Sequence, residues 1–340
     1  MNLEWVKLND ADRRTILEQT AVRNGYIVQA VEKDWWVTTV LEALFTLPFA
    51  QQLSFKGGTS LSKCWGIIKR FSEDIDIAIN REFFGFSGEL SNKDIRKGLR
   101  KKLCAFVRTE MKNIVENRLF EMGIPREWFT VTAVETTNST VDPESIYVNF
   151  SPLFPVVDYL PASIKIEVSG RSMTEPVVEA SIKSMVAEQF PAASYADAAF
   201  NVSAVAPKRT FLEKAFLLHE LLTQTDTINI DRRSRHLYDL EKMMESQIET
   251  DALFDSELYR DIIEHRRKFI AIGGFDYDSL LPATLCFIPS AEQSKAWEED
   301  YLNMQENMIP KGSKSYPELI ERLASLNQHF RAVEWGSKTK

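Results

Sequence analysis

Apolar residues recur at helical spacing through the first fifty positions of the chain. The segment DADRRTILEQTAVRNG, residues 10–25, ends at a glycine, the residue most often found just past a helix end. The segment VEKDWWVTTVLEALFTLP, residues 31–48, stays apolar at helical spacing until Pro48, which cannot continue a helix. The pattern therefore predicts two helices at the start of the chain.

The middle of the chain carries short segments rich in β-branched and aromatic residues and bounded by turn formers, which predicts strands. These are LSF at 53–55, IDIAI at 75–79, WFTVTAVET at 128–136, SIYVNFSP at 145–152 and ASIKIEVSG at 162–170. From about Lys208 the helical spacing returns, in the segments 209–224, 235–246, 258–271 and 317–330. The order of elements predicts an α+β fold that ends in a helical lobe.

The chain is long enough for two domains. Its 340 residues exceed the size at which one hydrophobic core usually stops growing. The stretch EQFPAASYADAAFNVSAVAP, residues 188–207, carries two prolines and many small residues, which is typical of a crossing between domains. We expect a core with the N-terminal helices over residues 1–200 and a helical lobe over residues 201–340.

Composition and charge exclude several classes of protein. The sequence has no run of about 18 uninterrupted apolar residues and its first residues form no apolar leader, so we expect a cytoplasmic protein with no membrane partner. Its three cysteines are widely spaced and form no C-x-x-C pair, which argues against disulfides and a zinc site. The net charge of −8 argues against indiscriminate nucleic-acid binding, and no DNA partner is expected.

One local basic cluster contrasts with this acidic total. Six cations of SNKDIRKGLRKKL are mostly three or four residues apart: Lys93, Arg96, Lys97, Arg100, Lys101 and Lys102. On a helix this spacing gives one positive face, which could contact phosphates or be an ordinary solvated surface.

Two aspartates interrupt the predicted strand IDIAI and its approach. Alternate residues of a strand share a face, so Asp74 and Asp76 point together while the isoleucines between and after them face a core. Neighbouring carboxylates repel each other, and a bound Mg²⁺ relieves this repulsion while it also holds phosphate oxygens. Glu167, between two apolar residues of another predicted strand, is the candidate third ligand of a two-metal site for phosphoryl transfer.

A turn of small residues precedes the aspartates. Gly57, Gly58 and Thr59 join the strand 53–55 to a predicted helix, TSLSKCWGIIKR, over residues 59–70. Glycine lets backbone N–H groups approach a ligand closely, and a helix start favours anions, so this turn is a candidate phosphate site. The turn and the D-x-D pair are each common alone, but their order along the chain indicates a nucleotide-binding site.

In this order, FKGGTSLSK followed by RFSEDIDI resembles the AbiEii/AbiGii nucleotidyltransferase toxins, a MenT-like family among the polymerase-β-like nucleotidyltransferases. The resemblance extends to VEKDWWVTTVLEALF, IKIEVS, PKRTFLEKAFLLHE and RRSRHLYDL, and it covers roughly residues 1–245. It implies a mixed sheet with flanking helices, and a C-terminal helical lobe that completes the active-site cleft.

The resemblance also implies roles for individual residues. The catalytic residues would be Asp74, Asp76, Glu167, Lys214 and Asp239. The carboxylates of Asp74, Asp76 and Glu167 would hold two Mg²⁺ ions. The nucleotide-binding residues would be Gly57, Gly58, Thr59, Ser60, Lys63, Ser72, Arg235 and His236.

Structural explanations stay open for the candidates in the C-terminal lobe. Lys214 can form a surface ion pair with neighbouring Glu213 instead of binding a triphosphate. Asp239 can lie in a structural salt bridge, and His236 can cap or pack instead of acting as a general base.

The activity implied by the resemblance is transfer of a nucleotide from a nucleoside triphosphate to an acceptor hydroxyl, with loss of pyrophosphate. The family implies a toxin of a toxin–antitoxin or abortive-infection system that inhibits translation, with an RNA acceptor such as the tRNA 3′ end and a separately encoded antitoxin. Two alternatives stay open: a nucleotidyltransferase that modifies protein hydroxyls, and a non-catalytic nucleotide-binding module.

Overall fold

The computed structural model describes residues 3–134, 143–223, 230–309 and 312–335. The chain divides into two compact units. The first unit comprises residues 1–65 and 71–205, and the second comprises residues 66–70 and 206–340. The second unit therefore includes a short segment, Gly66–Arg70, that the sequence places between the glycine turn and the two aspartates.

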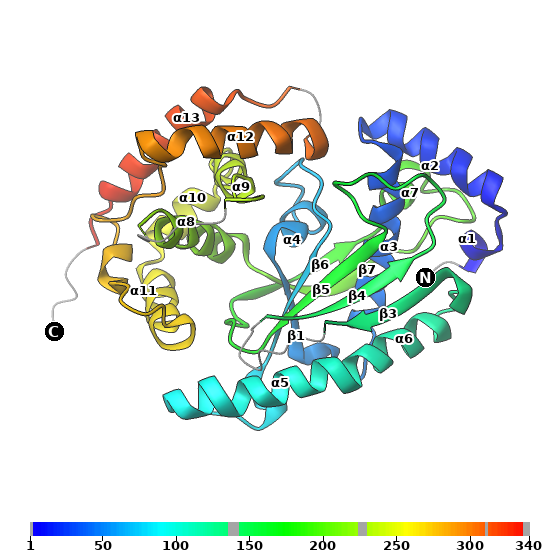
Figure 1. Ribbon diagram of the computed structural model, residues 1–340, viewed down its shortest axis with the longest axis horizontal. Helices are drawn as coiled ribbons and strands as arrows, with labels where there is room; N and C mark the ends of the chain where they lie inside the picture. The colour runs from blue at the N-terminus through cyan, green and yellow to red at the C-terminus, as the bar shows by residue number, and fades with distance from the viewer. Residues whose placement is uncertain (1–2, 135–142, 224–229, 310–311, 336–340) are drawn as a thin grey trace. The chain divides into compact units, whose positions relative to one another are not determined.

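A seven-stranded sheet forms the centre of the first unit (Figure 1). Its strand order is β3-β4-β5-β2-β1-β7-β6. The strands are β1 (Leu53–Lys56), β2 (Ile75–Ile79), β3 (Phe129–Ala133), β4 (Glu144–Phe150), β5 (Ser163–Ser169), β6 (Val177–Ile182) and β7 (Phe200–Val205). β2 pairs with β5, and β1 with β7, in parallel, whereas the other neighbours are antiparallel, so the sheet is mixed.

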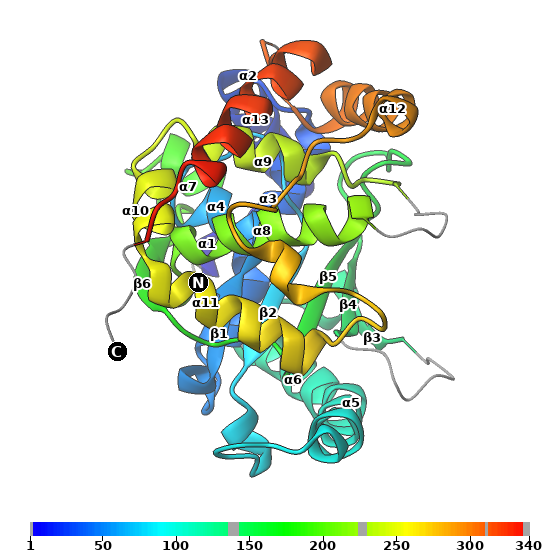
Figure 2. The same ribbon diagram turned by 90° about the vertical axis from the view of Figure 1, so that its left-hand side faces the viewer.

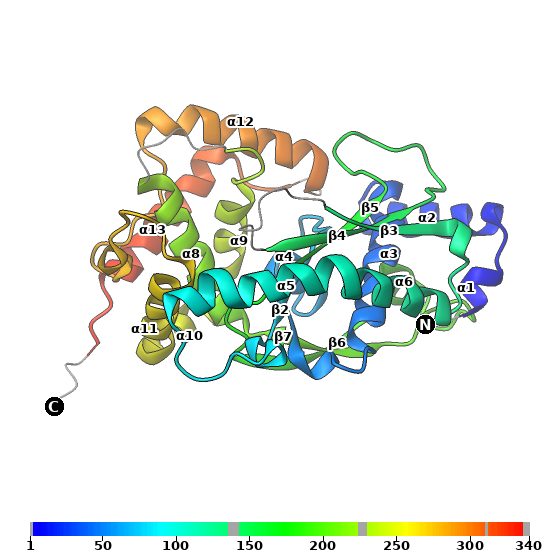
Figure 3. The same cartoon turned by 60° about the horizontal axis from the view of Figure 1, so that its bottom comes forward.

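Within the described residues of the first unit, seven α-helices flank this sheet. They are α1 (Leu3–Lys7), α2 (Asp10–Asn24), α3 (Val28–Phe45), α4 (Gly57–Lys63), α5 (Arg100–Phe106), α6 (Lys112–Glu121) and α7 (Met185–Gln189). π-helical stretches at Asp94–Leu99 and Val107–Met111 extend α5 and join it to α6, and Figure 3 shows the resulting long rod alongside the sheet. α3 is almost wholly buried, and it packs on the sheet and on α6.

The central strands alternate between a buried and a half-exposed face. In β4, β5 and the start of β2, every second residue is fully buried, including Ile75, Ile166 and Ile146. These residues join the hydrophobic core under α3 and α6. The residues between them are polar and half-exposed, so one face of the sheet centre carries the charged side chains described below.

The second unit is helical in its described residues. Its α-helices are α8 (Pro207–Thr223), α9 (Arg235–Met243), α10 (Ile248–Phe254), α11 (Ser256–His265), α12 (Ala291–Met308) and α13 (Tyr316–Arg331). α8 packs against α9, α10 and α11, as Figure 2 shows. Buried aromatic rings hold these helices together, with Phe216 edge-on to Tyr259 at 4.9 Å and Phe211 stacked on Phe330 at 5.7 Å between ring centroids.

The α+β prediction is confirmed, as are all the strands and helices that the hydrophobic pattern indicated, except for one helix. The helix expected over residues 59–70 ends at Lys63, and its second half belongs to the loop that enters the second unit. Strands β6 and β7 and helices α1, α6, α7, α10 and α12 were not predicted, and the predicted crossing at 188–207 contains β7. The ends of two predicted elements, at Glu135, Thr136 and Gln224, lie outside the described residues.

None of the helices in the described ranges is both long enough and apolar enough to span a bilayer.

Candidate functional site

A row of polar residues crosses the half-exposed face of the sheet. The strand registers place Asp76 of β2 between Lys56 of β1 and Glu167 of β5, and Glu167 is opposite Ser145 of β4. Residues in register on neighbouring strands share a face. Asp76 and Glu167, which are 91 positions apart in the sequence, are therefore side by side on one face of the sheet.

Asp74 lies just before β2 and is half-buried, like Asp76. We call Asp74, Asp76 and Glu167 the acidic face. Lys165, two residues before Glu167 on β5, donates from Nζ to Glu167 Oε1 at 2.6 Å. Burial alone would lower the pKa of Lys165, but the hydrogen bond and charge of Glu167, with the charges of Tyr147 and Asp74, raise it above its ordinary value. Lys165 thus offsets part of the negative charge of the acidic face.

The surroundings of position 57 require a glycine at the start of α4. A Cβ at this position would lie 2.0 Å from Asp76 Oδ2, and the backbone has a φ of +80°, which favours glycine. The glycine therefore allows the Asp76 carboxylate to lie directly against the α4 backbone.

Hydroxyl groups of α4 hold the loop that leads into β2. Thr59 Oγ1 donates to the backbone carbonyl of Asp74 at 2.5 Å and is 2.9 Å from Ser72 Oγ. Ser60 Oγ donates to the Gly57 carbonyl at 2.9 Å. These side chains therefore bond the protein itself, and Gly58, Thr59 and Ser60 are buried, so phosphate binding by the backbone N–H groups at this helix start stays a prediction.

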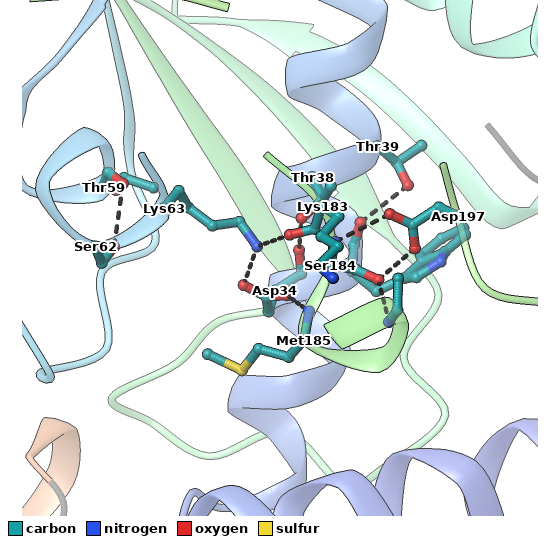
Figure 4. A network of polar contacts seen from close by, with 12 residues as sticks. Asp34, Thr38, Thr39, Thr59, Ser62, Lys63, Lys183, Ser184, Met185 and Asp197 are labelled. Carbon is teal, nitrogen blue, oxygen red and sulfur yellow. Dashed lines mark hydrogen bonds and ion pairs between the residues drawn. The ribbon is translucent and has the colours of Figure 1, made fainter. Parts of the chain in front are cut away.

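Helix α3 anchors both segments of the nucleotide motif through charged residues. Lys33 Nζ bonds Glu73, next to Asp74, and also donates to the Pro161 carbonyl at 2.9 Å. Asp34 accepts from Lys63 Nζ of α4 at 2.5 Å and from the Met185 N–H at 2.7 Å (Figure 4). These buried pairs fix the positions of α4 and of the approach to β2 relative to α3.

Lys63 was predicted to bind nucleotide. Its ammonium also donates to the Lys183 carbonyl at 3.1 Å, and its side chain is largely buried (Figure 4). The structure thus brings Lys63 to Asp34, not to the acidic face, and a nucleotide-binding role for it stays a prediction.

The acidic face fits a divalent cation in its chemistry. Carboxylate oxygens are the protein ligands that Mg²⁺ prefers, and Asp76 and Glu167 present them side by side. In the parts of the chain that the structure describes, no three His, Cys, Asp or Glu side chains converge as a ready-made metal-binding group. The metal-binding role of Asp74, Asp76 and Glu167, and the two-metal arrangement, therefore stay a prediction.

The second unit contains a different group of charges. Arg70 donates from Nε and Nη2 to the two carboxylate oxygens of Asp239 at 2.7 and 2.8 Å. Lys214 Nζ of α8 lies 2.8 Å from Asp239 Oδ2 and 3.4 Å from His236 Nδ1. We call Arg70, Lys214, Asp239 and His236 the buried ion cluster, because all four side chains are buried.

Burial and neighbouring charges shift the pKa values of the side chains in the buried ion cluster. Burial would raise the pKa of Asp239, but the charges of Arg70 and Lys214 outweigh it, and the pKa is lowered. Burial lowers the pKa of Lys214. Burial, together with the charges of Lys214 and Arg235, lowers the pKa of His236 well below its ordinary value, so the ring is neutral at physiological pH.

The cluster decides between some of the explanations that the sequence left open. Glu213 accepts from Arg209 at 2.9 Å, one turn earlier on α8, so the proposed surface pair of Glu213 with Lys214 is wrong. Lys214 pairs with Asp239, and Asp239 lies in a buried salt bridge. Nε2 of His236 has no hydrogen-bond partner within the described ranges, and Arg235 beside it is half-exposed.

Three important partners were missed by sequence reasoning. Lys165 was detectable, because it alternates with Glu167 in IKIEV by the rule that places Asp74 beside Asp76. Arg70 and the pair of Lys33 with Glu73 carried no such signal, because their partners are 169 and 40 positions away in the sequence.

A family model described as "Nucleotidyl transferase AbiEii toxin, Type IV TA system" matches residues 39–330. No significant match is found among curated proteins. Among solved structures, the chain is similar to MenT4, a nucleotidyltransferase toxin from Mycobacterium tuberculosis H37Rv, with 16% identity over 94% of each chain and a TM-score of 0.47. Since the family model spans most of the sequence, this chain belongs to the AbiEii nucleotidyltransferase toxins of type IV toxin–antitoxin systems.

Proposed function

We propose that this nucleotidyltransferase uses Mg²⁺ to transfer a nucleotide from a nucleoside triphosphate to an RNA hydroxyl, such as that of the tRNA 3′ end, and thereby inhibits translation. The observation that carries the proposal is the register of Asp76 with Glu167 on a half-exposed strand face, with Asp74 nearby. Membership of a toxin family supports the inhibitory role and a separately encoded antitoxin.

The chain's own residues would hold and orient the reacting groups. Asp76 and Glu167, with Asp74, would bind the metal ion, which when bound neutralises charge on the triphosphate and on the departing pyrophosphate. Thr59 holds the backbone of Asp74, and Gly57 leaves space for the Asp76 carboxylate. The acceptor oxygen would form a bond to the α-phosphorus as the bond to the bridging oxygen of pyrophosphate breaks, and the hydroxyl proton would pass to solvent.

An RNA acceptor is supported by the basic cluster of the first unit. Lys93, Arg96, Lys97, Lys101 and Lys102 are exposed on the helical stretch that includes Asp94–Leu99 and the start of α5. Lysines that contact phosphates make nucleic-acid affinity salt-dependent. We therefore expect Lys97→Glu with Lys101→Glu to weaken RNA binding and to reduce the slope of log affinity against log salt by about two. An unchanged slope would mean that these lysines are an ordinary solvated surface that does not contact RNA.

The deciding experiment compares acceptors directly. The full chain is incubated with Mg²⁺, each α-³²P-labelled triphosphate in turn, and either total RNA or a protein extract. Label in tRNA supports the proposal. Label in protein only would indicate a protein-modifying enzyme, and no label with either acceptor would favour a non-catalytic module.

Two aspartate variants control this assay. Asp76→Asn removes a charge from the acidic face, whereas Asp158→Asn changes an exposed aspartate outside it. Labelling that survives in the first variant would show that another site, or a contaminating enzyme, transfers the nucleotide.

A further inference from the structure

A cavity of about 220 Å³ lies among the N-terminal helices of the first unit. Four of the protein's seven tryptophans line it: Trp5, Trp35, Trp36 and Trp128. The other walls come from α2, the start of α3 and the loop after β4, and the acidic face contributes no residue. Since a water molecule takes up about 30 Å³ of liquid, the space suits one flat ring system better than a drug-sized ligand.

The indole walls are held rigidly by packing. Trp5 stacks on Trp35 with 5.5 Å between ring centroids, and Trp35 meets Trp36 edge-on at 5.2 Å. Trp128 is half-exposed, and the Arg13 guanidinium lies 3.9 Å from the centroid of its ring. Since Trp5, Trp35 and Trp36 are buried, Trp128 is the accessible indole of the four, and stacking on aromatic rings is a main source of affinity for unpaired bases.

Two charged side chains in the wall supply complementary hydrogen-bonding groups. Glu32, buried on α3, accepts from the Leu153 N–H at 2.6 Å through Oε1 and is also hydrogen-bonded to the Phe154 backbone, and a carboxylate can accept further bonds. Arg13 is 7% exposed and donates to Asp10 at 2.5 Å, yet its buried Nε finds no hydrogen-bond partner among the residues that the structure describes. An unsatisfied buried donor is unfavourable, and a ligand that accepts from it would remove this cost.

We propose that this cavity is a binding site for a single unpaired guanine base, separate from the transfer site. Guanine is flat, and it carries N–H donors at N1 and N2 for the Glu32 carboxylate. On its other edge it has acceptors at O6 and N7, which arginine recognises in nucleic acids. Adenine has no carbonyl oxygen, and uracil and cytosine offer less area for stacking on the tryptophans.

The same chemistry could come from a free nucleoside or from a base within an RNA strand. Equilibrium dialysis of the full-length protein with ³H-guanosine in EDTA tests the first source. Because guanosine has no phosphate and EDTA removes divalent ions, this binding does not depend on the transfer site. Equilibrium dialysis with labelled hexauridylate that carries one central guanine, against plain labelled hexauridylate, tests the second source.

We expect saturable binding at one site per chain, with Trp128→Ala and Glu32→Gln each weakening it at least about tenfold. Glu32→Gln keeps an oxygen for the Leu153 N–H, so it remains decisive if Trp128→Ala fails to fold. The matched controls are Glu18→Gln, an exposed glutamate on α2, and Asp76→Asn, both of which should bind guanosine like the wild type.

The outcomes separate this site from the proposed function. Saturable binding of either ligand that Glu32→Gln weakens supports the proposal, even if no transfer activity is found. No saturable binding of either ligand, or equal affinity in the wild type and Glu32→Gln, overturns it and leaves the assignment of the transfer site untouched.

Discussion

Charged side chains from the predicted motifs cluster in two regions of the protein, and the two clusters differ in how far their side chains are exposed and paired. In the acidic face of the first unit, the side chains of Glu167 and Lys165 are 24% and 31% exposed, and Asp74 and Asp76 are half-buried. In the buried ion cluster of the second unit, Asp239 is 0% and Arg70 2% exposed. A ligand can reach the first group, whereas the charges of the second are already paired within the fold.

This difference in exposure and pairing distinguishes the roles of two aspartates that the family resemblance treats alike. Asp76 and Asp239 are both aspartates of the resembling motifs, but Asp76 lies beside another carboxylate and Asp239 lies between two cations. A carboxylate beside like charges gains from binding a metal ion, and a carboxylate already bound by Arg70 and Lys214 gains little. We therefore expect the acidic face to carry the chemistry and the buried ion cluster to stabilise the fold of the second unit.

The largest expected effect is loss of transfer in Asp76→Asn. The substitution keeps the shape of the side chain and removes a charge that would bind the metal ion, so the rate of transfer should fall at least about a hundredfold. Because Asp76 is half-exposed, the melting temperature should stay within a few degrees of the wild-type value. Incorporation of labelled triphosphate and a thermal melt check both parts, and near-normal transfer with Mg²⁺ would remove Asp76 from the site.

Asp239→Asn should have the opposite signature. It leaves Arg70 and Lys214 buried without their anion, and breaking a buried pair in this way costs about 3–5 kcal/mol of unfolding free energy. Urea titration followed by circular dichroism measures this loss, with Asp158→Asn as the exposed control. A variant that keeps wild-type stability but loses transfer would move Asp239 from a structural to a catalytic role.

The hydrophobic pattern was sufficient to predict most of the fold. The helices α2 and α3 and the strands β2, β4 and β5 have sharp periodicity and clear boundaries, and they are confirmed. β6 was missed because it is a largely exposed edge strand, and β7 because small residues and prolines precede it. The early end of α4 was missed because tertiary contacts of the segment 66–70 override its helical pattern.

Sequence reasoning named the carboxylates of the candidate site but not the cations that pair with these and neighbouring carboxylates. A D-x-D pair is visible in the sequence because strand alternation is a local rule. Arg70 could not be assigned, because its bonds to Asp239 depend on how two distant segments fold together. The same holds for Lys33 of α3. Its partner Glu73 is 40 positions away in the sequence, and a local periodic pattern cannot predict a contact at that separation.

A smaller effect than that of Asp239→Asn is expected from the pH dependence of stability, through His236 of the second unit. The pKa of His236 is lowered in the folded protein, so below the ordinary value of about 6.5 the unfolded state binds more protons. Stability is then fully present above about pH 6.5 and falls as the pH drops towards the folded-state pKa, by at most about 1.4 kcal/mol per pH unit for one group.

His236→Gln should therefore flatten the decline in unfolding free energy between about pH 6.5 and pH 5. Buried His219, whose pKa burial also lowers, remains in this variant and leaves part of the slope. Urea titrations at several pH values measure the two slopes. Equal slopes in the wild type and His236→Gln would mean that His236 titrates normally and is not closed within the cluster.

The smallest expected effect concerns the lysine of the acidic face. Lys165→Met removes the ammonium that bonds Glu167, and a partly exposed pair of this kind contributes at most about 1 kcal/mol. Without it the carboxylates repel each other more strongly, so the metal-free variant should melt slightly below the wild type. Mg²⁺ should then raise the melting temperature of Lys165→Met by more than that of the wild type, because the ion neutralises a larger excess of negative charge.

Lys214→Met is the matched change in the buried ion cluster, and it should lower the melting temperature without altering the shift caused by Mg²⁺. Thermal melts with and without Mg²⁺ distinguish these results, and an equal shift in the wild type and Lys165→Met would show that Lys165 and the ion do not act on the same carboxylates.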